Sequence, residues 1–112
     1  MNRRRWFLAG LAALSLAAAP VNVGSAKCKG CHKVQHDSWA ASKHAKAKVD
    51  CETCHGPGSE YKALKVMKDK AASMKAGLLM PGKAECGKCH GKGKVPAITD
   101  ALFAKVHAHK KK

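Results

Sequence analysis

Residues 28–32 (CKGCH), 51–55 (CETCH) and 86–90 (CGKCH) decide the organisation of this chain, because these three stretches contain all six of its cysteines. Cys-x-x-Cys-His is the attachment signature of c-type haem. In such a motif the two thiols bond to the vinyl groups of a haem, and the histidine that follows binds the iron as an axial ligand. The sequence therefore predicts three covalently bound haem c groups.

Each motif supplies two thioether bonds and one proximal iron ligand. The predicted thioether residues are Cys28, Cys31, Cys51, Cys54, Cys86 and Cys89, and the predicted proximal ligands are His32, His55 and His90. Cys-x-x-Cys pairs also occur in zinc sites, redox dithiols and disulfide scaffolds. None of these alternatives needs a histidine at the next position, whereas this chain has one after every pair.

The amino-terminal residues have the pattern of an export signal. Arginines occupy positions 3–5, residues 6–19 are apolar, and Gly24-Ser25-Ala26 offers small residues at the cleavage positions. We predict a signal peptide over residues 1–26 that is cut after Ala26.

Two alternatives to this cut remain. Ala17-Ala18-Ala19 is a weaker site because Pro20 would follow the cut. An uncleaved anchor is the other alternative, although the apolar run is shorter than the roughly 18 residues that a membrane span needs. Export through the predicted signal implies a periplasmic or extracellular protein without a transmembrane span, in a compartment that oxidises free thiols unless haem binds them.

The charge balance bears on the partners. The chain has 22 basic and 7 acidic residues, and removal of the three leader arginines lowers its formal charge from +15 to +12. Haem propionates would reduce this charge to about +6, and a basic surface favours acidic partners. We expect other redox proteins, such as an acidic or membrane-bound cytochrome and a reductase. Export argues against nucleic acid as the partner.

Residues 27–112 form one small domain in this interpretation. A chain of this size cannot bury a conventional core and usually depends on disulfides, metals or cofactors. We therefore expect a mainly α fold with much irregular loop, wrapped around three stacked haems and without a significant β-sheet. Helices are expected over residues 37–48, 59–75 and 101–109, with Gly77 ending the second.

Four histidines lie outside the motifs and are candidates for the sixth coordination position of the irons. In falling order of preference for a distal ligand they are His44, His107, His109 and His36. Bis-histidine ligation fills both axial positions and suits electron transfer, whereas an open iron suits ligand binding or catalysis. Met80 and Tyr61 are weaker candidates for a sixth ligand, and Met67 and Met74 are expected to pack along a helix face.

The stretch CKGCHKVQHDSWAASKHAKAKVDCETCHGPGSEY resembles the multihaem cytochromes c that include the tetrahaem carrier of ammonia oxidation. In that family Cys-x-x-Cys-His is followed by Trp-x-x-Ser-x-His, matched here by Trp39, Ser42 and His44, and then by CxxCHGPG, matched by residues 51–58. The resemblance implies that His44 is a distal ligand and that the haems are closely stacked. This chain has three motifs where the tetrahaem relatives have four, and Glu60 and Tyr61 lie where they often have a histidine.

These observations favour an electron carrier that passes single electrons between respiratory partners and binds no substrate. A small haem enzyme with one open iron, which would reduce a nitrogen or oxygen species, is the alternative class. A homo-oligomer or a subunit of a conductive haem filament is a third, because a neighbouring chain can supply a distal ligand.

The first prediction concerns haem content. A pyridine haemochrome assay combined with the intact mass should find three haems on each exported chain, and the sequence alone predicts that this chain begins at Lys27. Fewer than three haems would contradict the assignment of all three motifs.

Overall fold

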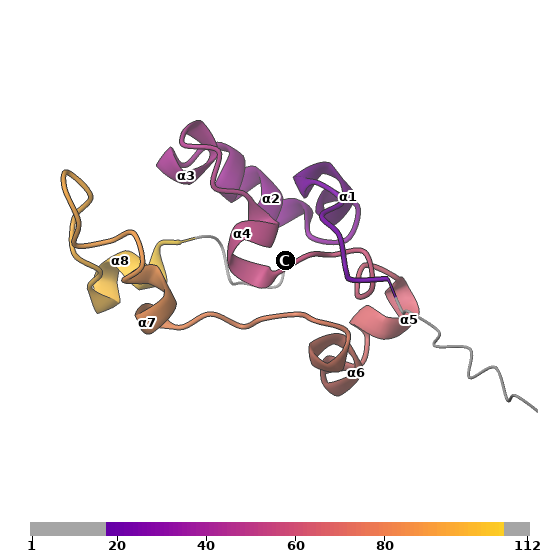
Figure 1. Ribbon diagram of the computed structural model, residues 1–112. Helices are drawn as coiled ribbons and strands as arrows, with labels where there is room; N and C mark the ends of the chain where they lie inside the picture. The colour runs from indigo at the N-terminus through magenta and orange to yellow at the C-terminus, as the bar shows by residue number, and fades with distance from the viewer. Residues whose placement is uncertain (1–17, 107–112) are drawn as a thin grey trace, which may run out of the picture.

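The computed structural model describes residues 18–106 and leaves residues 1–17 and 107–112 undescribed (Figure 1). The described part consists of short helices, turns and irregular loops, and no strand occurs in it. This confirms the prediction of a mainly helical chain without a β-sheet for these residues. The helices are α1 (Ser25–Lys29), α2 (Lys33–Ala40), α3 (Lys43–Lys46), α4 (Cys51–His55), α5 (Leu64–Met67), α6 (Lys70–Lys75), α7 (Lys83–Cys86) and α8 (Asp100–Ala104).

Figure 1 shows α1 to α4 gathered in one group and α5 with α6 at one side of it. From α6 an extended segment runs back beneath α4 to α7 and α8. This segment brings the third motif close to the second although 35 residues separate their first cysteines in the sequence. No helix in the described part is long and apolar enough to cross a membrane.

Side-chain caps begin several of these helices. Asp50 accepts a hydrogen bond from the Thr53 backbone N–H at 2.9 Å, and the Thr53 hydroxyl accepts one from the Asp50 backbone N–H at 3.1 Å. This reciprocal pair satisfies two backbone donors at the start of a helix. It fixes the first turn of α4, which is the second Cys-x-x-Cys-His motif itself.

The continuous helix predicted over residues 59–75 is wrong, because two short helices, α5 and α6, occupy part of that range. The Asp69 side chain accepts a hydrogen bond from the Ala72 N–H at 3.0 Å and so begins α6 as a new helix. Aspartate favours such caps over helix interiors because its carboxylate competes for backbone donors. The predicted apolar face is also incomplete, since Leu64 and Met74 are exposed.

Two other predicted helices are confirmed in part. Residues 37–48 are largely helical, but α2 ends at Ala40 and α3 begins after Ser42. The last helix, α8, begins at Asp100, and residues 107–109 of its predicted range lie outside the described part.

Gly77 ends α6 as predicted. Its φ is +104°, and the N–H of Leu78 donates to the carbonyl of Ser73 at 3.0 Å while the N–H of Gly77 donates to Met74 at 3.1 Å. These two bonds form the Schellman arrangement that commonly closes a helix on a glycine.

The polypeptide supplies almost no apolar core of its own. Among the described residues Tyr61 is the only buried hydrophobic side chain, at 6% exposure. Large apolar side chains stay at least two-fifths exposed at Val21, Val34, Leu64, Met74, Leu79, Met80 and Val95. Packing within the chain alone therefore contributes little of the burial that stabilises an ordinary domain.

Glu52 is a buried polar centre in place of an apolar one. Its side chain is within α4, only 4% of the residue is exposed, and its carboxylate accepts three backbone hydrogen bonds. The donors are the N–H groups of Val23 at 2.8 Å, Gly24 at 2.8 Å and Gly58 at 2.7 Å. Hydrogen bonds to a charged group contribute about 1.5–3 kcal/mol each to the stability of a fold. Through these three bonds the carboxylate joins residues 23–24 and the turn after α4 to the second motif.

The turn after α4 requires glycine at position 56. Gly56 has φ +82° and ψ 167°, a backbone region open essentially to glycine alone. A Cβ atom at this position would also lie 2.9 Å from the carbonyl oxygen of Gly77. The close approach allows the Leu79 N–H to donate to the His55 carbonyl at 2.9 Å, which joins the extended segment to the second motif.

Replacement Gly56→Ala should lower the free energy of unfolding of the holoprotein by about 1–3 kcal/mol. In the variant, both the backbone conformation of alanine at this position and the contact of its Cβ with Gly77 would be strained. Thermal denaturation followed by circular dichroism should show a fall in Tm. The matched control is Gly30→Ala, since Gly30 has φ −57° and a Cβ there meets no atom within 4 Å. Equal melting temperatures for the two variants would contradict the strained turn.

Candidate functional site

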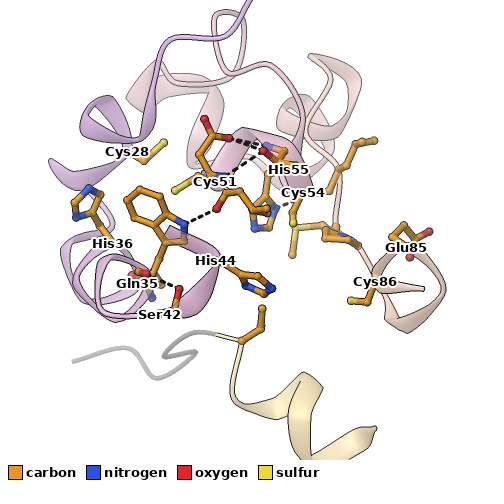
Figure 2. Close-up of a pocket in the computed structure, with 18 of the residues that line it drawn as sticks. Cys28, Gln35, His36, Ser42, His44, Cys51, Cys54, His55, Glu85 and Cys86 are labelled. Atoms are coloured by element: carbon orange, nitrogen blue, oxygen red, sulfur yellow. Dashed lines mark hydrogen bonds between the residues drawn. The ribbon is translucent and has the colours of Figure 1, made fainter. Parts of the chain in front are cut away.

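A cavity of about 1180 Å³ brings the three motifs together (Figure 2). All six cysteines line it, and so do all five histidines of the described residues: His32, His36, His44, His55 and His90. Pockets for a single small ligand usually measure about 300–1,000 Å³. The size and the lining of this cavity fit a large prosthetic group better than a small substrate.

The histidines of the second and third motifs, which are predicted proximal ligands, are held by backbone carbonyls. The Nδ1 atom of His55 lies 2.8 Å from the Leu79 carbonyl oxygen, and the Nδ1 atom of His90 lies 2.8 Å from the Pro96 carbonyl oxygen. Because a carbonyl only accepts, each Nδ1 must carry a proton, and in the neutral imidazole the lone pair is then on Nε2. This is the arrangement by which proteins orient a histidine that binds a metal.

The rings of His44 and His90 are neighbours in the cavity. Their ring centroids are 5.9 Å apart and their ring planes are nearly perpendicular, at 87°. Two imidazoles on opposite sides of one metal ion, each with a nitrogen about 2 Å from it, have ring centres roughly 6 Å apart. The separation of these two rings therefore fits a shared iron between them.

The Trp-x-x-Ser-x-His segment explains how His44 reaches this position. The Trp39 indole N–H donates to the Val49 carbonyl at 2.7 Å and joins α2 to the non-helical segment before α4. The Ser42 hydroxyl accepts a hydrogen bond from the Ala45 N–H at 3.4 Å and caps α3, the one-turn helix that carries His44. Figure 2 shows the His44 ring directed into the cavity.

The thiols of neighbouring motifs lie close together. The Cys28 thiol hydrogen-bonds with Cys51, and burial followed by this neighbour raises the pKa of Cys28 to about 11. Burial, and then the proximity of Cys86, raises the pKa of Cys54 above its usual value. The second motif therefore lies between the first and the third.

His36 has a less defined role. It lies one helical turn after His32 in α2, its side chain is 14% exposed, and its ring centroid is 5.4 Å from that of Trp39. Its Nδ1 atom is buried without a hydrogen bond and lies 3.6 Å from a carboxylate oxygen of Asp37. The other two distal candidates, His107 and His109, lie outside the described residues.

The donors fit haem attachment better than a free metal ion. No group of three or more His, Cys, Asp or Glu side chains within residues 18–106 is arranged to hold one. The thiols instead occur as pairs along an apolar cavity wall, and each pair is followed by an imidazole that lines the same cavity. Leu79 and Met80 belong to this wall and are 58% and 59% exposed, so they have apolar surface available for a prosthetic group.

Sequence reasoning missed the groups that orient these donors. The carbonyls of Leu79 and Pro96 belong to residues of no special chemistry, and every residue type carries a carbonyl. The role of Glu52 was also missed, although a carboxylate between the two cysteines of a motif is a visible signal. Its partners come from distant parts of the chain, so the sequence alone could not supply them.

The hydrogen bonds and the raised pKa of Tyr61 argue against its being an iron ligand. Its hydroxyl donates hydrogen bonds to the carbonyls of Gly56 and, at 3.3 Å, His55. Burial raises the pKa of Tyr61 to about 12, so the phenol is neutral at physiological pH. A neutral phenol that already donates to the backbone is a poor ligand, and Tyr61 instead braces the turn after α4.

The raised pKa of Tyr61 predicts a pH dependence of stability. Since the unfolded phenol ionises near 10 and the folded one near 12, its contribution is complete below pH 10 and is lost as the pH rises toward 12. Tyr61→Phe should remove this component and cost about 1 kcal/mol at neutral pH through the lost hydrogen bond. Denaturation of the wild type and of Tyr61→Phe between pH 8 and about 12 measures this difference in the free energy of unfolding. Parallel pH dependences of the two proteins would contradict the prediction. An altered haem spectrum of Tyr61→Phe at neutral pH would instead indicate that Tyr61 is an iron ligand.

Comparisons of the chain with protein-family models, with curated proteins and with solved structures found no match.

Proposed function

We propose that this chain is an exported triheme cytochrome c that passes single electrons between redox partners. The observation that carries the proposal is the neighbouring pair His44 and His90, whose ring centroids lie 5.9 Å apart within a cavity lined by all six motif cysteines. The resemblance to multihaem cytochromes c is consistent with it. Haem c, once attached, supplies reversible one-electron chemistry at its iron.

The residues of the chain have separate tasks in this proposal. The cysteine pairs anchor the haems, and His32, His55 and His90 supply proximal nitrogens. The carbonyls of Leu79 and Pro96 accept the Nδ1 protons of His55 and His90, so Nε2 is the atom that would bind iron in each ring, and the hydrogen bond to Nδ1 increases its basicity. His44 would fill a sixth position and so exclude water and substrates from that iron.

The placement of the motifs suits passage of electrons along the chain. Cys28 adjoins Cys51, and Cys54 lies near Cys86, so the attachment points of successive haems are neighbours. Closely spaced cofactors need no moving part or bound substrate for electron transfer. The protein's contribution is ligation, spacing and the local dielectric, all of which affect the reduction potential.

The charge of the chain suits acidic partners. Lysine and arginine outnumber acidic residues 22 to 7, and two of the described acidic residues, Asp37 and Asp100, are already paired with Lys33 and Lys83. The remaining positive charge should accelerate association with an acidic redox protein, and the acceleration should fall as salt rises. We place this exchange in the periplasm or outside the cell.

Spectra of the purified holoprotein, oxidised and reduced, with and without carbon monoxide, test the proposal. Low-spin iron throughout and no change with carbon monoxide are expected for an electron carrier with filled axial positions. A high-spin fraction that binds carbon monoxide would instead favour the haem enzyme with one open iron. Light scattering of the same sample separates a discrete protein from a haem filament.

Replacement His44→Ala should convert about one third of the haem to a high-spin, carbon monoxide-binding form, because one of three irons loses its sixth ligand. The haem content should stay at three per chain, since the variant keeps every cysteine. Lys46→Ala is the matched control, because Lys46 is an exposed residue of the same helix that does not line the cavity. A His44→Ala protein that remains wholly low-spin would show that His44 is not an axial ligand.

A further inference from the structure

Residues 21–25 are joined to the second motif by hydrogen bonds, although the small-residue pattern at Gly24-Ser25-Ala26 would assign them to the leader. The Val21 carbonyl accepts from the Ser59 N–H at 3.2 Å, and the Val21 N–H donates to the Ser59 hydroxyl at 2.9 Å. The Ser25 hydroxyl accepts from the Cys51 N–H at 3.3 Å. We call residues 21–25 the amino-terminal strap.

The strap also provides two of the three donors to the buried Glu52 carboxylate, through the N–H groups of Val23 and Gly24. Without them the carboxylate would keep the Gly58 N–H alone while lying in a site where 4% of the residue is exposed. A buried charge that loses hydrogen-bond partners destabilises the structure around it. A chain cut after Ala26 would lose both of these donors.

The side chain of Val23 is part of the cavity lining. Val23 lines the cavity, and a Cβ placed on Gly58 would lie 3.2 Å from its Cγ2 atom. The strap therefore covers the turn after α4 as well as holding Glu52. Its sequence VNVGS carries no charged side chain, as expected for a segment that packs on other parts of the chain.

We propose that the strap belongs to the mature protein and that the leader is removed within or directly after Ala17-Ala18-Ala19. The mature chain then begins at residue 18, 19 or 20 rather than at Lys27. The proposal rests on export, which the basic and apolar amino-terminal sequence predicts, and it is independent of the haem ligands. The small residues Gly24 and Ser25 have positions in the fold, since Ser25 begins α1 and Gly24 adopts φ +88° in front of it.

The intact mass of the exported protein tests this boundary. The full chain is produced in a bacterial host that attaches c-type haem. The molecular mass of the purified protein is then measured by mass spectrometry before and after removal of the haem. A polypeptide that starts at residue 18, 19 or 20 is expected. A start at Lys27, or a retained leader, would overturn the proposal. The number of haems follows separately from the difference between the masses before and after haem removal.

Two leader variants sharpen the assignment. Ala26→Phe places a large side chain where a cut after residue 26 requires a small one, so processing should be unchanged if the cut lies upstream. Replacement of Ala17, Ala18 and Ala19 together by phenylalanine removes the small residue before each of the three proposed cuts, so processing should slow and the precursor should accumulate. Blocked processing in Ala26→Phe, or unaffected processing in the triple variant, would overturn the boundary.

A deletion tests whether the strap has a structural role. Removal of residues 20–26, with the leader left intact, should lower the melting temperature and increase cleavage by added protease relative to the wild-type holoprotein. Asn22→Ala is the control, because Asn22 lies exposed in the strap and its side chain makes no hydrogen bond among those described. A deletion variant as stable as the control would show that the strap is dispensable.

Discussion

The main constraint on this chain is that its apolar side chains have no polypeptide core to enter. Tyr61 alone is a buried hydrophobic residue in the described part, while Leu79, Met80 and Val95 are exposed and line a cavity of about 1180 Å³. Apolar surface that lines such an open cavity is removed from water only when something apolar fills the cavity. In our proposal the haems fill it, so that attachment of the cofactors and formation of the core are one event, as in small metal domains.

Polar interactions hold the cavity in place of a core. The reciprocal Asp50 and Thr53 cap fixes α4, and the buried Glu52 carboxylate draws the amino-terminal strap and the turn at Gly58 onto it. The carbonyls of Leu79 and Pro96 then orient His55 and His90, the predicted proximal ligands. The helices that carry a motif cysteine or His44, namely α1, α3, α4 and α7, are only four or five residues long, so they position these side chains without burying a long apolar face.

The predicted helices were accurate where a local signal had no competitor. Gly77 ended α6 because a left-handed residue was needed there and glycine adopts that conformation without strain. The helix predicted over residues 59–75 from apolar periodicity is interrupted at Asp69, because this side chain accepts a hydrogen bond from the Ala72 N–H and begins a separate helix. The resulting turn allows the Ser73 hydroxyl to donate to the Val66 carbonyl at 2.8 Å, a contact between α5 and α6 that periodicity could not anticipate.

The sequence by itself determined the chemistry of the candidate site, since the thiols and the adjacent imidazole of each motif are fixed by covalent neighbourhood. It also identified His44 as the leading distal candidate through the Trp-x-x-Ser-x-His segment. Only the tertiary structure decided that the His44 ring lies beside that of His90, that Cys28 adjoins Cys51, and that residues 23 and 24 donate hydrogen bonds to Glu52. These contacts join positions far apart in the chain, and their geometry depends on how the turns direct the helices, which residue spacing does not record.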